Sequence, residues 1–434
     1  MKITHIHIER FRGFQNEDFE VGSLLTAIAG QNGTQKSTLL GIITQTFTLK
    51  TEDSMRVEKP LCGGSYISAF KDKFRLSPTF DKPKGHEWTI SFDAGMDDFT
   101  VESIKRTGDP NVRFWKKGAR QEGDGYISFP TIFLSLKRLV PVAEEAKIIT
   151  DDTLLTQEEL NEFKQLHNKI LIAQTPISSA TTITSKNKQS IGVSTELYDW
   201  NQNSMGQDNL GKIILALFSF KRLHDKYPRQ YKGGILAIDE MDATMYPASQ
   251  VELLKVLRKY ASKLNLQILF TTHSMSLLKA MDDLVQEVTK KEETANQAKI
   301  LYLKKVDDKI AIKQGVNFKG IQLDLNVVAE GNNRKKNRIT AYTEDKENIL
   351  FVKAILKSKA FVLDFVDVTL PCSTLMELVT KRVPAFIYPY SIVILDGDVR
   401  MNKNDLRKIN NADNILILPG NKSPERLLAS YLYT

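Results

Sequence analysis

The stretch Gly30-Gln31-Asn32-Gly33-Thr34-Gln35-Lys36-Ser37-Thr38 decides the fold of this chain. It follows the apolar run Leu24–Ala29 and precedes a second apolar run, Leu39–Ile43, which is typical of a helix. A strand, a glycine-containing loop, Lys-Ser and a helix together form a phosphate cradle, in which backbone N–H groups and the helix N-terminus surround the phosphates. In such a loop Lys36 reaches the outer phosphates, and the Ser37 hydroxyl coordinates Mg²⁺.

One position departs from the usual pattern G-x-x-x-x-G-K-[ST]. Gln35 stands where a glycine normally precedes the lysine. That position favours a backbone conformation in which a Cβ is unwelcome, so we expect strain at Gln35. The loop therefore predicts nucleotide binding more strongly than it predicts fast hydrolysis. The predicted nucleotide contacts within it are Gly30, Asn32, Gly33, Gln35, Lys36, Ser37 and Thr38.

Composition sets the broad class of the chain. It has 434 residues, of which 41% are hydrophobic and 26% charged, as in an ordinary globular protein with two or more domains. No apolar run approaches the roughly 18 residues of a membrane span, and the N-terminus lacks the continuous apolar region of a secretion signal. Two cysteines, Cys62 and Cys372, are too few for a disulfide framework, which favours a cytoplasmic location. The net charge of +8 permits contact with nucleic acid without requiring it.

The first half of the chain is rich in predicted strands. Residues 3–29 predict two strands joined by a turn at Arg12-Gly13. Thr156-Gln157-Glu158-Glu159 is a capping box that begins a helix, and the polar, β-branched segment Thr181–Ser190 predicts a loop. Short strands separated by turns are expected at His86–Phe92, Phe99–Arg106, Val112–Lys117 and Thr131–Leu139.

Helices and strands alternate in the second half, as in a parallel α/β sheet. The basic run Gly331–Arg338 predicts a boundary, beyond which a smaller α/β unit follows. Before the boundary we expect helix Asn209–Leu223, strand Gly234–Ile238, helix Ser249–Leu264, strand Gln267–Thr271 and a hairpin of Ile300–Val306 and Lys309–Lys313. Beyond it we expect strand Ile339–Tyr342, helix Glu347–Ser358, a strand near Val366–Thr369, a helix near Thr374–Thr380 and strand Ser391–Leu395.

Three groups of polar residues stand where these elements begin or end. The strand Gly234–Ile238 delivers Asp239 to a magnesium shell, and Glu240 beside it is suited to polarise an attacking water. Ser204 to Gln207 open a helix, where a hydroxyl and free amides bind an anion, although an ordinary N-cap has the same residues. His273 follows a strand, where a lone histidine is usually a satisfied structural residue.

The order of these groups resembles the ATP-binding-cassette class of ATPases, in particular the branch with RecF, SMC and Rad50 proteins and the overcoming-lysogenization-defect nucleases. The N-terminal MKITHIHIERFRGF and the phrase IDEMDATMYP are similar to that branch. The resemblance covers residues 1–50 and 195–316. It implies a signature motif at Ser204, Gly206 and Gln207, the Walker B aspartate Asp239, the catalytic glutamate Glu240, the D-loop residue Asp242 and the switch histidine His273. The Q-loop stays open among the end of strand Thr131–Leu139, Gln45 and Gln121.

The resemblance also implies a domain layout and an assembly. An ABC-type ATPase domain would occupy residues 1–330, with its nucleotide core at 1–50 and 195–316 and an inserted β-rich and helical lobe at 51–194. A signature helix cannot reach the phosphates bound by its own loop, so a complete site needs two subunits face to face. We therefore expect a homodimer, or a larger assembly of such dimers, with ATP and Mg²⁺ at the interface.

Acidic residues gather in the smaller unit, residues 331–434. The strand Ser391–Leu395 is followed by Asp396-Gly397-Asp398, whose carboxylates would point the same way on an extended strand end and share Mg²⁺. With Glu344 and Ser423-Pro424-Glu425, they resemble the TOPRIM module of overcoming-lysogenization-defect and Gabija nucleases. The resemblance implies a second Mg²⁺ site at Glu344, Asp396 and Asp398 for phosphodiester cleavage. The glycine expected after Glu344 is missing, so an active nuclease and a degenerate structural or docking module both stay open.

The whole layout resembles ATPase subunits of prokaryotic antiviral defence systems, including Septu and certain retrons. The implied function is a slow dimeric ATP hydrolase that senses nucleotide and controls a separate nuclease effector of the HNH type. Two alternatives remain, a self-contained ATP-regulated TOPRIM nuclease and a RecF-like DNA-repair ATPase.

Overall fold

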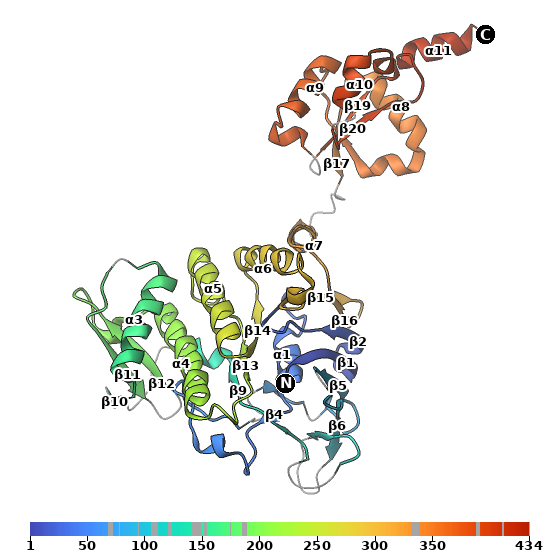
Figure 1. Cartoon of the computed structure of the whole chain (residues 1–434). Helices are drawn as coiled ribbons and strands as arrows, with labels where there is room; N and C mark the ends of the chain where they lie inside the picture. The colour runs from blue at the N-terminus through green and yellow to red at the C-terminus, as the bar shows by residue number, and fades with distance from the viewer. Residues whose placement is uncertain are drawn as a thin grey trace. The chain divides into compact units, whose positions relative to one another are not determined.

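The computed structural model divides the chain into two compact units, Met1–Leu323 and Asp324–Thr434, which are described separately (Figure 1). The structure describes residues 1–67, 73–77, 79–93, 95–105, 112–119, 124–139, 149–151, 154–173, 175–184, 189–330, 338–387, 391–409 and 412–433. Among these residues, no helix combines the length and the apolar character that crossing a membrane would need.

A six-stranded sheet forms the centre of the first unit. Its order is β16-β15-β3-β14-β13-β9, and every neighbouring pair is parallel except β15 with β16. The strands are β3 (Leu25–Gly30), β9 (Thr131–Leu134), β13 (Gly234–Ile238), β14 (Leu266–Thr272), β15 (Ala298–Val306) and β16 (Lys309–Lys313). All residues of β3, β13 and β14 are buried, as expected for strands covered on both faces. The predicted parallel α/β core is therefore confirmed.

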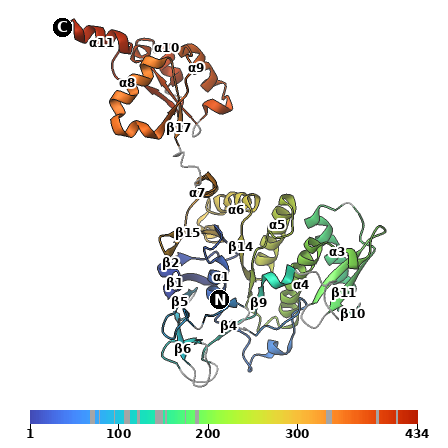
Figure 2. The ribbon, with the colours of Figure 1, turned by 180° about the vertical axis from the view of Figure 1, so that it is seen from behind.

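Helices and a second sheet cover the central sheet. The long helices of this unit are α1 (Lys36–Thr44), α4 (Met205–Lys226), α5 (Pro247–Lys263) and α6 (Met275–Val288). Figure 2 shows α5 and α6 side by side, and the two helices are in contact. Apolar residues of α1 such as Leu39 and Ile43 share one core with Ile28 and Leu269 of the central sheet and with Trp88 of the second sheet. Helix α1 is therefore enclosed between the two sheets.

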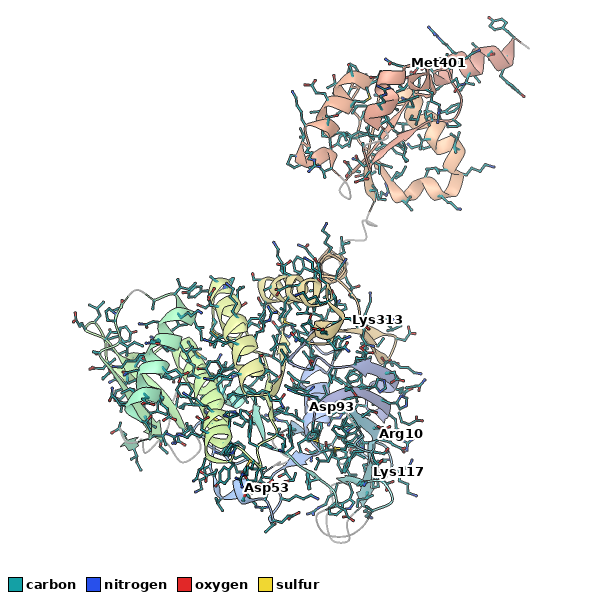
Figure 3. The ribbon with its side chains drawn as sticks, in the orientation of Figure 1. Arg10, Asp53, Asp93, Lys117, Lys313 and Met401 are labelled. Carbon is teal, nitrogen blue, oxygen red and sulfur yellow. The ribbon has the colours of Figure 1, made fainter. Side chains whose placement is uncertain are left out.

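The second sheet is antiparallel, with the order β2-β1-β5-β6-β7. Its strands are β1 (Ile3–Phe11), β2 (Phe14–Glu20), β5 (Glu87–Phe92), β6 (Phe99–Lys105) and β7 (Val112–Lys116). The last three confirm predicted strands, although Arg106 lies outside the described residues. Arg10 and Lys117, both labelled in Figure 3, each pair with Glu87 of β5. A short parallel pair, β4 (Phe47–Thr48) with β8 (Ile127–Ser128), forms a separate two-stranded sheet, and Phe47 packs against Phe92 of β5.

Two predictions for residues 1–139 need correction. Residues 3–29 form three strands rather than two, because the chain breaks at Gly22, whose N–H donates to Thr26 Oγ1, and β3 then enters the central sheet. The turn at Arg12-Gly13 is confirmed. The strand predicted at Thr131–Leu139 ends at Leu134 and continues as the 3-10 helix η2 (Leu136–Leu139).

A smaller layer packs on α4. It contains β10 (Ile149–Asp151), β11 (Ser179–Thr184), β12 (Gln189–Ser194) and α3 (Gln157–Leu171), with the strand order β10-β11-β12. The capping box at Thr156 and Glu159 is confirmed. The loop predicted at Thr181–Ser190 is wrong outside residues 185–188, which are not described, because Ile183 and Ile191 are buried in paired strands. Short 3-10 helices lie at Ser54–Val57 (η1), Trp200–Gln202 (η4) and Glu292–Thr294 (η5).

The second unit has a parallel four-stranded sheet in the order β18-β17-β19-β20. Its strands are β17 (Ile339–Thr343), β18 (Leu363–Phe365), β19 (Ser391–Leu395) and β20 (Ile415–Ile417). Its helices are α8 (Lys346–Leu356), η6 (Lys357–Val362), α9 (Cys372–Thr380), η7 (Pro384–Phe386), η8 (Gly397–Met401), α10 (Lys403–Ile409) and α11 (Pro424–Leu432). Helix α7 (Phe318–Glu330) contains the division between the two units. The strand predicted near Val366–Thr369 lies earlier, at β18, because Leu363 rather than those residues is buried beside β17.

Candidate nucleotide-binding site

The carboxyl ends of three parallel central strands bring the predicted site together. Thr272 of β14 pairs with Ala29 of β3, and Ile238 of β13 pairs with Phe270 of β14. The chain therefore leaves all three strands at the same edge of the sheet. This edge carries the loop that begins at Gly30, the Asp239-Glu240 pair and His273, and such an edge is where ligands bind in open α/β sheets.

The loop has a backbone that suits a phosphate group. Gly33 has φ of 80°, and the position that a Cβ would occupy there has no atom within 4 Å. Gly30 has φ of 152°, and a Cβ there would lie 2.4 Å from the carbonyl oxygen of Leu303. Thr34 closes the turn by donating its hydroxyl to the Gln31 carbonyl at 2.8 Å. Glycine is therefore required at Gly30 by close packing, whereas Gly33 leaves room for a ligand to approach the backbone.

Gln35 has the left-handed conformation that its place in the loop predicts. Its φ is 62° and its ψ is 32°, at the N-cap of α1, and its side chain does not cap the helix. Its Oε1 atom is buried without a hydrogen-bond partner among the described residues. A non-glycine residue in this conformation, with an unsatisfied buried acceptor, stores strain next to the lysine.

Lys36 folds over the loop that precedes it. Its Nζ donates to the carbonyl oxygens of Gly30 at 3.0 Å and Gln31 at 2.8 Å, which uses two of its three donors. Burial lowers the pKa of Lys36 to about 8, and the nearby carboxylates of Glu240 and Asp239 act in the opposite direction. One ammonium donor is therefore left to bind a phosphate oxygen.

The two predicted magnesium ligands are in direct contact. Ser37 Oγ donates to Asp239 Oδ1 at 2.8 Å, and Thr271 Oγ1 donates to the same oxygen at 2.7 Å. Mg²⁺ prefers hard oxygen ligands and commonly combines one or two carboxylates with substrate phosphates. The hydroxyl of Ser37 and the carboxylate of Asp239 fit such an ion, although they lie far apart in the sequence.

Glu240 and His273 join the same cluster. Glu240 also has a left-handed backbone, with φ of 49°, and its N–H donates to Thr271 Oγ1 at 2.6 Å. The backbone N–H of His273 donates to Asp242 Oδ1 at 3.3 Å. Burial and the positive charge of Lys36 lower the pKa of His273, and Asp242 opposes this shift. The histidine, the lysine and the carboxylates are therefore close enough to influence one another's charge.

The predicted signature residues lie elsewhere on the unit. Ser204 is the N-cap of α4, and its Oγ accepts from the N–H of Gln207 at 3.4 Å while Gln207 Oε1 accepts from the N–H of Ser204 at 2.8 Å. Gly206 packs so tightly that a Cβ would lie 2.5 Å from the carbonyl oxygen of Thr244. Among the described residues, no hydrogen bond joins Ser204, Gly206 or Gln207 to the loop Gly30–Thr38. The side chains of Asn32 and Thr38 in that loop likewise make no hydrogen bond among the described residues, and Ser204 itself is exposed.

Sequence reasoning missed Arg138, which lies in η2 directly after β9. Arg138 is 3% exposed, and its guanidinium donates to the carbonyl oxygens of Asp239 and Glu240 at 2.6 and 2.8 Å. Its position, at the strand end that we considered for the Q-loop, was the only signal in the sequence. Of the other Q-loop candidates, Gln45 follows the far end of α1, about 13 Å along the helix from Lys36. Gln121 lies outside the described residues.

A second acidic group follows β17 and β19 in the smaller unit. The strand order changes direction between these two strands, which makes their carboxyl ends a switch point. Glu344 Oε1 accepts from the N–H of Asp396 at 2.9 Å. Burial raises the pKa of Glu344 to about 7 and that of Asp396 to about 6, and Asp398 adds to both shifts. The predicted carboxylates are therefore close together.

Their arrangement differs from the prediction. Asp396 is buried and Asp398 is exposed, because the strand ends at Leu395 and a 3-10 helix begins at Gly397, so the extended geometry expected for the pair is absent. The carboxylate oxygens of Asp345, Glu347 and Glu425 all lie within 4.8 Å of one another.

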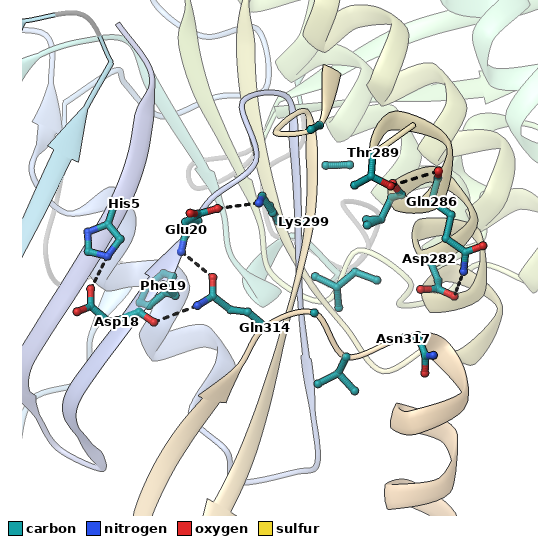
Figure 4. A pocket seen from close by; sticks show the side chains of 16 residues that line it. His5, Asp18, Phe19, Glu20, Asp282, Gln286, Thr289, Lys299, Gln314 and Asn317 are labelled. Atoms are coloured by element: carbon teal, nitrogen blue, oxygen red, sulfur yellow. Dashed lines mark hydrogen bonds and ion pairs between the residues drawn. The ribbon is translucent and has the colours of Figure 1, made fainter. Parts of the chain in front are cut away.

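A pocket of about 610 Å³ opens at the opposite edge of the central sheet, between β2, α6, β15 and the residues before α7 (Figure 4). Ala298 in its wall pairs with Leu25, the first residue of β3, so the pocket is remote from the loop at Gly30. Its polar groups satisfy one another, since His5 pairs with Asp18 and Lys299 with Glu20.

Comparisons with known proteins find similarity to an AAA ATPase domain and to SMC head domains. Residues 135–278 match the family model described as AAA ATPase domain, and no curated protein matches the chain. The chain is similar to the SMC head domain from Thermotoga maritima, with 14% identity over 73% of this chain and 100% of that one, and a TM-score of 0.40. It is also similar to an Smc head domain from Pyrococcus yayanosii, with 11% identity over 76% of this chain and 99% of that one, and a TM-score of 0.42. The family match covers residues 135–278, which include Asp239, Glu240 and His273 but not the loop Gly30–Thr38.

Proposed function

We propose that the chain binds ATP with Mg²⁺ at the loop Gly30–Thr38 and hydrolyses it slowly as a homodimer. The observation that carries the proposal is the contact of Ser37 and Thr271 with Asp239 Oδ1. This contact joins the loop Gly30–Thr38 to the ends of β13 and β14. It lies next to Lys36, in a loop whose backbone is open at Gly33.

Each residue of the cluster has a role that its position supports. Lys36 and the loop N–H groups bind the phosphates, and Ser37 and Asp239 hold Mg²⁺. When bound there, Mg²⁺ would neutralise part of the phosphate charge. Glu240 accepts a proton from the attacking water, and its peptide is fixed on one side by Thr271. His273 lies at the same edge, where its lowered pKa favours the neutral ring as a hydrogen-bond donor to the nucleotide.

A second copy of the chain would complete the site. Ser204 is exposed at the start of α4 and makes no contact with its own phosphate loop among the described residues. Large apolar side chains near it are also exposed, with Leu197 81%, Met205 44% and Tyr246 51% accessible. Exposed apolar groups around a helix N-terminus suit a partner surface that carries bound phosphate. We therefore place ATP between Lys36 of one copy and Ser204 of the other.

The biological role proposed for this ATPase rests on its resemblance to antiviral ATPase subunits. A strained Gln35 next to Lys36 suits a slow ATPase that reports nucleotide state rather than a motor. In this role, ATP closes the dimer, hydrolysis opens it, and an associated nuclease effector of the HNH type responds to the difference. The effector would act in the cytoplasm, on nucleic acid present there.

The Glu240→Gln variant tests the ATPase proposal, because it keeps the size of the side chain and removes the proton acceptor. We expect ATP with Mg²⁺ to hold this variant as a dimer in size-exclusion chromatography with light scattering. Lys36→Met is the control that should stay insensitive to ATP. If ATP changed neither the mass nor the thermal stability of Glu240→Gln, the proposal would fail.

A second candidate function is metal-dependent cleavage of nucleic acid by the smaller unit. The close approach of Glu344 and Asp396 favours it, because neighbouring carboxylates are typical ligands of a divalent cation. Burial raises both pKa values, and nearby carboxylates add to the shifts. Purified chain should then cut DNA with Mg²⁺ or Mn²⁺, and Asp396→Ala should not. If the DNA stays equally intact with the wild-type chain and with Asp396→Ala, this unit is a structural or docking module.

A further inference from the structure

Arg138 is a buried cation whose partners are neutral oxygens. Its Nε donates to Asn209 Oδ1 at 2.7 Å, and its two terminal nitrogens donate to main-chain carbonyls. Two of these acceptors are the carbonyl oxygens of Leu134 at 3.2 Å and Ser135 at 3.1 Å, so the side chain also bonds to the end of β9, directly before its own helix. No carboxylate pairs with it at ion-pair distance among the described residues. A buried arginine held in this way is costly unless each donor is used, and here all three nitrogens are used.

The carbonyl groups that Arg138 holds belong to the residues on which hydrolysis would depend. Asp239 O lies 2.6 Å from one terminal nitrogen, and Glu240 O lies 2.8 Å from the other. Glu240 has φ of 49°, a conformation that needs support from its surroundings. Thr271 Oγ1 accepts a hydrogen bond from the N–H of Glu240, and Arg138 donates one to the carbonyl oxygen of Glu240. The Glu240 residue is thus fixed from both sides.

The remaining donor of Arg138 reaches α4. Asn209 is fully buried near the start of this helix, and its Nδ2 donates to the carbonyl oxygen of Ala243 at 3.0 Å. Gly206, one turn earlier, packs against the carbonyl oxygen of Thr244. The start of α4, with Ser204 as its N-cap, is therefore attached to the turn that follows Glu240, both directly and through Arg138.

We propose that Arg138 is a positioning residue that orients Glu240 and couples it to α4. This inference rests on the proposed function, since Ser204 on α4 would contact the nucleotide of the partner copy. A shift of α4 when two copies meet would pass through Asn209 and Arg138 to the peptide of Glu240. Arg138 does not touch the nucleotide, so it sets turnover and its dependence on dimerisation rather than the affinity of one copy for ATP.

The test uses variants of the full chain that break different branches of this network. Arg138→Met keeps the aliphatic length and removes all donors, Arg138→Lys keeps one charged donor group, and Asn209→Ala cuts only the branch to α4. Arg222→Met is the matched control, because Arg222 pairs with Glu159 at the far end of α4. For each protein we would measure binding of a fluorescent ATP analogue, kcat, thermal stability and ATP-dependent dimer mass.

We expect Arg138→Met to bind the analogue within about threefold of wild type and to lose at least about tenfold in kcat, as for a displaced general base. Arg138→Lys should recover part of this loss. Asn209→Ala should raise the concentration needed for ATP-dependent dimerisation by about fivefold or more. Arg222→Met should lose stability without a change in kcat.

Two outcomes would overturn the inference. One is an Arg138→Met variant with kcat within about twofold of wild type. The other is a parallel loss of binding, turnover and stability that Arg138→Lys does not relieve, which would make Arg138 a purely structural residue. A wild-type chain that binds no ATP analogue would instead overturn the proposed function, and the binding measurement separates that failure from these two.

Discussion

Binding of ATP should be accompanied by uptake of a proton at Lys36, and the amount should depend on pH. Burial lowers the pKa of Lys36 to about 8 in the free protein. The negative phosphates favour the charged ammonium, so the pKa is higher in the complex than in the free protein. The proton is therefore taken up on binding, and affinity falls as the pH rises through the pKa of the free protein.

The size of the effect follows from the two pKa values. If the bound lysine regains an ordinary pKa of about 10.4, roughly 0.1 proton is taken up per ATP at pH 7 and roughly 0.9 at pH 9. Over the same interval the charged fraction of free Lys36 falls about tenfold, and the affinity for ATP falls by the same factor.

Titration calorimetry at pH 9 measures this directly, in two buffers with different ionisation enthalpies and with Glu240→Gln to prevent turnover. The matched control adds Lys36→Arg, whose guanidinium stays charged throughout and should take up no proton. Uptake below about 0.3 proton at pH 9, or equal uptake by the arginine variant, would refute the assignment of this lysine to the phosphates.

Three further predictions concern strain, packing and acid stability. Gln35→Gly should raise kcat. It should change the free energy of unfolding by less than about 1 kcal/mol, because the relief of backbone strain is offset by the greater flexibility of glycine in the unfolded chain. A lower rate of phosphate release would show that the glutamine is adapted to its site. Gly206→Ala should cost about 1–3 kcal/mol and weaken ATP-dependent dimerisation, because its Cβ would lie 2.5 Å from Thr244 O; an unchanged melting temperature would contradict this. Burial lowers the pKa of His167 to about 4, so protonation favours the unfolded chain and up to ~3 kcal/mol of stability should be lost as the pH falls from 6.5 towards 4. His167→Leu should remove that dependence in urea titrations.

The sequence predicted the elements whose signal is local. The strands β3, β13 and β14 are continuous apolar runs that end in loops, and a run of this kind is typical of a strand buried on both faces. The left-handed backbone of Gln35 also followed from its place before Lys36. In the smaller unit, β19 was placed correctly because it is an apolar run bounded by Asp396.

The missed features depend on contacts between distant residues. The pair β11 and β12 has few strongly apolar residues, and it is fixed as a sheet by the burial of Ile183 and Ile191, with β12 in contact with α4. Arg138 has no motif of its own, since its partners Asn209 and Asp239 follow it by 71 and 101 residues. The exposed position of Asp398 depends on where the strand gives way to a 3-10 helix, a boundary that propensity does not define.

The central claim is that one ATP is held by Lys36 of one copy and Ser204 of the other. The most direct measurement mixes two inactive variants, Lys36→Met and Ser204→Arg, and follows ATP hydrolysis. Half of the randomly mixed dimers would contain one intact site, so we predict recovery of about a quarter of wild-type activity. A mixture as inactive as its two components would contradict the shared site.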